Sequence, residues 1–137
     1  MPDSRTHPHA EMPSEDVLSR LIAEKHPRHH DLYLAAHRLV LEVAPDVRVS
    51  VDLHDAVIGY GAHQYGYNGW GMGAVSPHAK WVSLVVFRGG ALDDPAGLLE
   101  GTGALVRHVK LTSLDEFESR REALMRLVTS AVGAAAS

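Results

Sequence analysis

Residues 47–87, VRVSVDLHDAVIGYGAHQYGYNGWGMGAVSPHAKWVSLVVF, contain most of the strand and turn signals of the chain. Apolar and polar residues alternate strictly over 47–53, a period of two that predicts a β-strand with one face toward the core. The other face should lie in water, and it carries Arg48, Ser50 and Asp52.

A hairpin signal stands in the middle of the same stretch. Asn68-Gly69 is typical of a type I′ turn, because both central residues of that turn need a positive φ. Links this short require antiparallel neighbours, since parallel strands need long crossovers. The further strands of this stretch are predicted over about 57–67, 70–76 and 81–87.

Helical signals lie on either side of the strands. Ser14 is a suitable N-cap for a short helix, and Pro45 ends a second one. Ser113 and Glu116 have the spacing of a capping box that opens a C-terminal helix. Strands grouped together with helices at the ends predict an α+β fold, with two N-terminal helices and one C-terminal helix packed on an antiparallel sheet of about five strands. The predicted ranges are 15–25, 28–43 and 113–132 for the helices and 105–111 for the fifth strand.

Composition fits one ordinary domain. The chain has 137 residues, 45% hydrophobic and 22% charged, and no cysteine. We predict a single domain over 14–132, a flexible N-terminal tail over 1–13 and a frayed C-terminus over 133–137. The net charge of −4 disfavours nucleic-acid binding, and no apolar run approaches the roughly 20 residues that cross a bilayer. A cytoplasmic location with no membrane partner is expected.

FRGGALDDPAGLLEGTGALVRHVKL, residues 87–111, closely resembles the signature of the YdhG-like family, domain of unknown function 1801. The run YGAHQY over 60–65 resembles a second family motif, although Ala62 and His63 replace its usual methionine and proline. The resemblance covers about 14–130. It implies a frataxin-like fold, and one branch of the family is described as an intracellular iron chaperone that donates iron for cluster and haem assembly. It brings no established catalytic residues.

A basic strand after a glycine-flanked threonine is the first candidate site. Alternation puts His108 and Lys110 on one face and Arg107 on the other. These side chains, with Arg88 and Thr102, could hold an anion through charge-assisted hydrogen bonds. The alternative is that they are solvated residues in surface ion pairs with nearby acids.

An aromatic group on the central hairpins is the second candidate. Tyr65 and Trp70 are the rings we expect to wall a shallow ligand groove, because they alternate with glycines. Packing of most such rings in the core is the competing interpretation, and burial statistics favour it.

Metal binding receives little support from the residues. Ten histidines are present, but their spacing lacks a fixed ligand set, so solvated helix-face histidines are the better interpretation. Iron would need a carboxylate ridge, for which Glu11, Glu15, Asp16, Glu24, Asp52 and Asp55 are available, and Glu15, Asp16 and Asp52 are the residues whose replacement would test it. No cofactor is predicted, with iron as the exception if the chaperone alternative holds.

The favoured hypothesis is a non-enzymatic binding or accessory domain for a small anionic or aromatic molecule. An iron chaperone and a homodimeric interaction module are the alternatives. Catalysis has no positive signal, because Ser83 lies inside a strand without the glycines of a nucleophile elbow.

Overall fold

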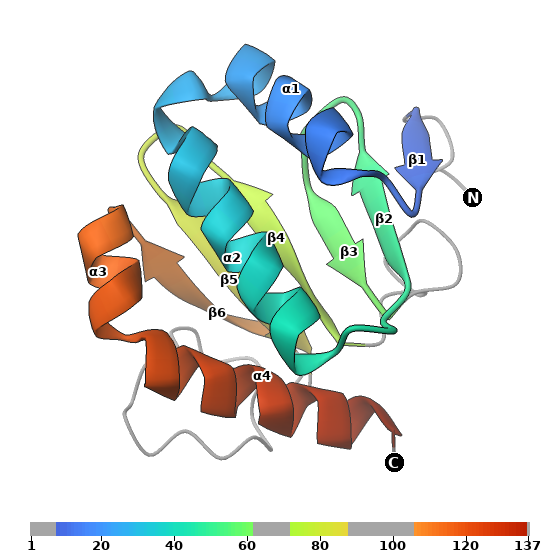
Figure 1. Cartoon of the computed structure of the whole chain (residues 1–137), viewed down its shortest axis with the longest axis vertical. Coiled ribbons are helices and arrows are strands. Elements are labelled where there is room, and N and C mark those ends of the chain that lie inside the picture. Colours follow the sequence, from blue (N-terminus) through green and yellow to red (C-terminus); the bar gives the residue numbers. More distant parts are fainter. Residues whose placement is uncertain (1–7, 62–71, 88–105, 137) are drawn as a thin grey trace.

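A six-stranded antiparallel sheet with helices on one face forms the α+β fold (Figure 1). The computed structural model of the protein describes residues 8–61, 72–87 and 106–136. Neighbours in the sheet follow chain order from β1 to β6, and every pair is antiparallel. This confirms the predicted α+β class. The strands are β1 (His9–Glu11), β2 (Val49–Asp52), β3 (Ile58–Tyr60), β4 (Gly73–Pro77), β5 (Val82–Phe87) and β6 (Val106–Leu111).

The additional strand is β1, which lies within the segment that we expected to be a tail. Its residues pair with the outer edge of β2, His9 opposite Asp52 and Glu11 opposite Ser50. Three residues are too few to show a period of two, so the sequence gives no signal for this strand. The edge of β2 that does not pair with β3 supplies the backbone hydrogen-bonding groups that order β1.

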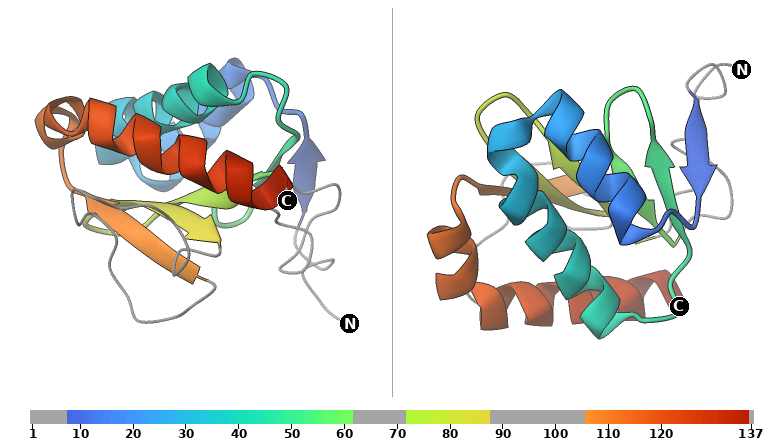
Figure 2. Two further views of the ribbon diagram at one scale, coloured as in Figure 1. Left: turned by 90° about the horizontal axis from the view of Figure 1, so that it is seen from below. Right: turned by 45° about the horizontal axis from the view of Figure 1, so that its top comes forward.

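The helices pack as a layer over one face of the sheet (Figure 2). Instead of one C-terminal helix there are two, separated at Arg120, and the second continues through Ala136 rather than fraying from 133. None of the described helices is both long and apolar enough to cross a bilayer. The helices are α1 (Glu15–Lys25), the 3₁₀ turn η2 (Pro27–His29), α2 (His30–Val43), α3 (Leu114–Ser119) and α4 (Arg121–Ala136).

Side-chain caps fix the starts of α1 and α3. The Ser14 hydroxyl accepts from the backbone N–H of Val17 at 3.2 Å. Ser113 accepts from the N–H of Glu116 at 3.0 Å, and the Glu116 carboxylate accepts from the N–H of Thr112 at 2.7 Å. The reciprocal pairing predicted for Ser113 and Glu116 is therefore present, with the return bond shifted by one residue.

Replacing the second cap should cost measurable stability. Ser113→Ala leaves the N–H of Glu116 without its partner and should lower the free energy of unfolding by about 1 kcal/mol, measured by urea denaturation. Ser130→Ala, inside α4, is the matched control and should cause no loss, because alanine is the better helix former. Equal effects at the two positions would show that the cap does not stabilise α3.

The hydrophobic core lies between the sheet and the helices. Cross-strand register aligns the apolar residues of the helix-facing side, for example Val75 beside Leu84 and Leu84 beside Val109. Burying this face gives the main stabilisation, at about 25 cal/mol per Å² of apolar surface. Fully buried side chains of the core include Leu18, Ile22, Leu39, Val40, Ile58, Phe117, Leu124 and Leu127.

The second face of β2 is not in water, contrary to the prediction. Ser50 and Asp52 are each only 2% exposed, whereas Arg48 is exposed. Alternation identifies which residues share a face, but it does not show whether that face is covered. Small side chains follow Ser50 across this face, since Gly59 lies opposite it and Ala74 lies opposite Gly59.

Two histidines expected in solvent are buried. His29 is 4% exposed and His37 is 3% exposed. His37 lies on the sheet-facing side of α2, where its Nδ1 and the Tyr60 hydroxyl share a hydrogen bond of 2.7 Å. A polar ring can be buried when it has such a partner, and the sequence does not reveal the partner.

Candidate functional site

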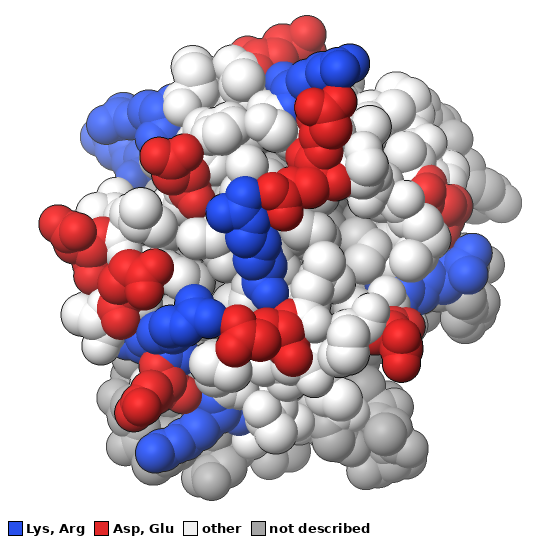
Figure 3. All heavy atoms as spheres, in the orientation of Figure 1, with Lys and Arg blue, Asp and Glu red and all other residues white. Residues whose placement is uncertain are grey.

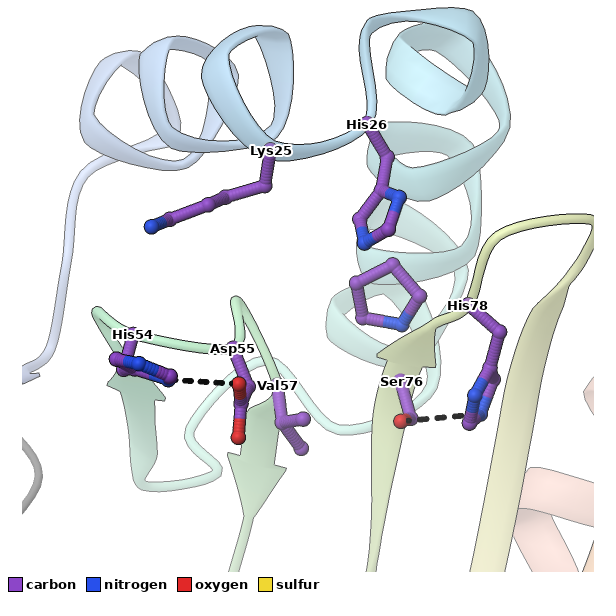
Figure 4. Close-up of a pocket in the computed structure, with 8 residues that line it drawn as sticks. Lys25, His26, His54, Asp55, Val57, Ser76 and His78 are labelled. Atoms are coloured by element: carbon purple, nitrogen blue, oxygen red, sulfur yellow. Dashed lines mark hydrogen bonds and ion pairs between the residues drawn. The ribbon is translucent and has the colours of Figure 1, made fainter.

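A pocket of about 360 Å³ opens where the α1–η2 connection meets two strand connections at one end of the sheet (Figure 4). We call it the corner pocket. Four of its side chains can carry positive charge, and one is an acid. It is lined by Lys25, His26, His54, Asp55, Val57, Ser76, Pro77 and His78.

The end of α1 supplies Lys25 and His26. Lys25 is the last residue of the helix, where its charge offsets the negative end of the helix dipole. His26 is the C-cap, and its backbone N–H donates to the carbonyl oxygen of Ile22 at 2.8 Å. Below it, Nε2–H of the buried His29 donates to the carbonyl oxygen of His78 at 2.9 Å. This bond ties the helix connection to the β4–β5 connection and so fixes His26 and His78 relative to each other.

The β2–β3 turn supplies His54 and Asp55. The buried Asp52 carboxylate accepts from the backbone N–H groups of His54 at 2.8 Å and Asp55 at 3.3 Å. Ala56 has a φ of 62°, and its carbonyl oxygen accepts from the Tyr33 hydroxyl at 2.7 Å. The turn is therefore held by hydrogen bonds to the buried Asp52 and Tyr33 side chains, although the His54 and Asp55 side chains are exposed.

His78 lies between the pocket and the outer face of the sheet, which is the face that the helices do not cover. Its Nε2 lies 3.4 Å from the Ser76 hydroxyl, and its ring stacks on Trp81 with the centroids 4.9 Å apart. The ammonium of Lys110 lies 4.7 Å from the centroid of the same tryptophan ring, a cation–π contact. Trp81 is oriented by its indole N–H, which donates to the Ser83 hydroxyl at 2.9 Å.

The pKa of His78 is lowered, by burial and in part by positively charged neighbours. Burial lowers the pKa of His78 most, and the nearby charges of His26, His108, Lys110 and His29 lower it further. Groups of one sign thus converge on this imidazole from both the pocket and the outer face. A bound anion would relieve that repulsion, so the arrangement suits a negatively charged ligand.

Three of the seven candidate residues from the sequence lie in the described part. His108 and Lys110 are opposite Val85 and Ser83, so they share one face of β6. Arg107 is opposite Val86, on the helix-facing side. Register therefore brings two of the three basic side chains together. The other candidates, Tyr65, Trp70, Arg88 and Thr102, lie outside the described residues.

Sequence reasoning missed the corner pocket itself. Lys25, His54 and His78 are far apart along the chain, and none belongs to a recognisable motif. The high histidine content was the one available signal, but it gives no information on which histidines meet.

The described residues hold no group of three or more histidine or acidic side chains arranged for a metal ion. Acidic and basic side chains alternate over the helix face (Figure 3). Glu15 binds Arg38 through two hydrogen bonds, and the pair lowers the pKa of Glu15. Asp16 pairs with Arg20 at 2.8 Å. The acids proposed for an iron ridge are therefore engaged with arginines or, for Asp52, with a turn.

Comparison of the chain with protein-family models, with curated proteins and with solved structures gave no match. The resemblance to the YdhG-like family accordingly stays a prediction from the two motifs.

Proposed function

We propose that this protein is a non-enzymatic binding domain for a small anionic molecule, which it holds in the corner pocket. The observation that carries the proposal is the convergence of Lys25, His26, His54 and His78 from three separate segments. The lysine ammonium and the imidazole N–H groups can donate hydrogen bonds to anionic oxygens, and hydrogen bonds to a charged group are worth about 1.5–3 kcal/mol each.

His108 and Lys110, on the outer face of β6, support the same proposal. Lys110 and His108 add to the positive potential at His78 without lining the pocket. Trp81 holds the Lys110 ammonium and the His78 ring in place through its π face. Two residues of the expected anion site, His108 and Lys110, therefore lie near His78 of the corner pocket, whereas Arg107 is on the helix-facing side.

Binding of inorganic phosphate tests the proposal. In isothermal titration at low ionic strength and pH 6.5, the protein should bind phosphate saturably. The double variant Lys25→Ala/His26→Ala should lose at least tenfold in affinity, because it removes the two donors at the end of α1. Salt should weaken binding, since exposed charges are screened.

Lys80→Ala is the control for lost charge. Lys80 is exposed in the β4–β5 connection and does not line the pocket, so this variant should bind phosphate as the wild type does. If the wild type shows no saturable binding, or if Lys80→Ala loses as much affinity as the double variant, the proposal is wrong.

The alternatives are less well supported. An iron chaperone would use Glu15, Asp16 and Asp52, and their carboxylates already have partners. The homodimeric module stays a prediction that light scattering can test.

A further inference from the structure

Asp55 is the one acid that lines the otherwise basic corner pocket in the described part of the chain. We infer that the ligand is a phosphate monoester of a polyhydroxy compound, with its phosphate bound by His26 and His78 and a hydroxyl group bound by Asp55. The inference rests on the proposed function and specifies its ligand.

The carboxylate of Asp55 has an open acceptor. Its Oδ1 accepts from Nδ1–H of His54 at 2.8 Å, and the described residues make no hydrogen bond to Oδ2. An ionised carboxylate has about four lone-pair sites, so Asp55 can accept further hydrogen bonds. A bare anion would be repelled by this group, whereas a hydroxyl would donate to it. The ligand should therefore carry both kinds of group.

His26 and His78 lie apart from Asp55 in the pocket. The two histidines lie on one side and the His54–Asp55 pair on the other, and the Lys25 side chain extends away from the two histidines toward the second side (Figure 4). The volume of about 360 Å³ is at the lower end of the range for small-molecule sites, about 300–1,000 Å³, and exceeds what a phosphate ion alone requires. Val57 and Pro77 add a small apolar wall against which a short carbon skeleton can pack.

Phosphate fits the donors better than a carboxylate does. A carboxylate is planar and is matched best by the fork of an arginine, and no described arginine lines the pocket. Each histidine is a single-point donor, and His26 and His78 come from two separate segments. Such donors suit a tetrahedral group whose oxygens point in several directions.

Four probes test the inference by isothermal titration: glycerol 3-phosphate, propyl phosphate, glycerate and inorganic phosphate. Glycerol 3-phosphate should bind about tenfold more tightly than propyl phosphate, which has no hydroxyl, as expected for one hydrogen bond to a charged group. Glycerate should bind more weakly than glycerol 3-phosphate. Asp55→Ala should abolish the preference for the hydroxylated ester and keep or improve the binding of inorganic phosphate, because it removes a negative charge.

Asp46→Ala is the matched control, since Asp46 is an exposed acid that does not line the pocket, and it should preserve the preference. Equal affinity for the two esters, or a preference that survives Asp55→Ala, would overturn the role of Asp55 while the anion site stands. Glycerate binding as tightly as glycerol 3-phosphate would overturn the assignment of phosphate. Failure of inorganic phosphate and both esters to bind would overturn the proposed function as well.

Discussion

Gly73→Ala is expected to lower the free energy of unfolding by about 3 kcal/mol. Gly73 begins β4 and lies opposite Val86 of β5. A Cβ atom at this position would lie 2.2 Å from the carbonyl oxygen of Val85. That oxygen belongs to the backbone of the neighbouring strand, so it cannot move aside as the end of a flexible side chain would.

Relief of this clash requires β4 and β5 to separate. Separation would weaken their ladder, at about 1 kcal/mol per hydrogen bond, and disturb the packing of Tyr60, which lies opposite Gly73 on β3. A domain of this size has a total stability of about 5–15 kcal/mol, so the loss is a large share of it.

Urea denaturation followed by circular dichroism measures the effect. Ser76→Ala lies in the same strand and is the control, because it removes only a half-buried hydroxyl with one long hydrogen bond of 3.4 Å. The midpoint for Gly73→Ala should fall well below that of the control with a similar denaturant slope. Equal midpoints would mean that the close approach of the two strands does not exist in solution.

Acidification should destabilise the protein through His37, by about 2 kcal/mol between pH 7.5 and pH 5. Burial lowers the pKa of His37 from 6.5 to about 4. The folded state therefore holds the neutral ring, while the unfolded state binds a proton near pH 6.5. The stabilisation is fully present above pH 6.5 and is lost progressively as the pH falls toward 4, reaching roughly 3 kcal/mol in total.

The groups that face His37 fix the window for this measurement. Glu15 raises and Arg38 lowers the pKa of His37 by charge, and Tyr60 shares its hydrogen bond. The pKa of Glu15 is lowered from 4.5, so its own contribution is lost only at more acid pH. The pKa of Tyr60 is raised far above the range used. Between pH 7.5 and 5 the titration of His37 can thus be separated from these neighbours.

The variant His37→Leu should reduce this pH dependence to the smaller part that His78 contributes, because the pKa of His78 is also lowered. It should also be less stable at pH 7.5, because it leaves the buried Tyr60 hydroxyl without its partner, which costs about 1–3 kcal/mol. Tyr60→Phe is the complementary control and should keep the pH dependence, since His37 stays buried. If His37→Leu loses stability with acid as steeply as the wild type does, another group is responsible.

Local signals account for most of the secondary structure. Each of these signals depends on neighbours within a few residues: the period of two over 47–53, the end of the second helix before Pro45, and the N-caps at Ser14 and Ser113. The α+β class and the antiparallel order followed from short connections, which restrict how neighbouring strands can pair. The resemblance of 87–111 to the YdhG-like signature falls largely outside the described residues and stays a prediction.

Departures from these predictions arose where a partner distant in sequence decided the outcome. The edge of β2 orders β1, and tertiary packing buries Ser50, Asp52, His29 and His37. No glycine or proline near Arg120 predicts the break between α3 and α4.

Local backbone preference and strict alternation predicted most of the elements, their antiparallel pairing and the face shared by His108 and Lys110, but not β1 or the break at Arg120. Which side chains form the corner pocket depends on tertiary packing alone. Lys25, His54 and His78 meet because a helix end and two strand connections converge at one end of the sheet, and contacts between segments so far apart leave no period, cap or motif in the chain.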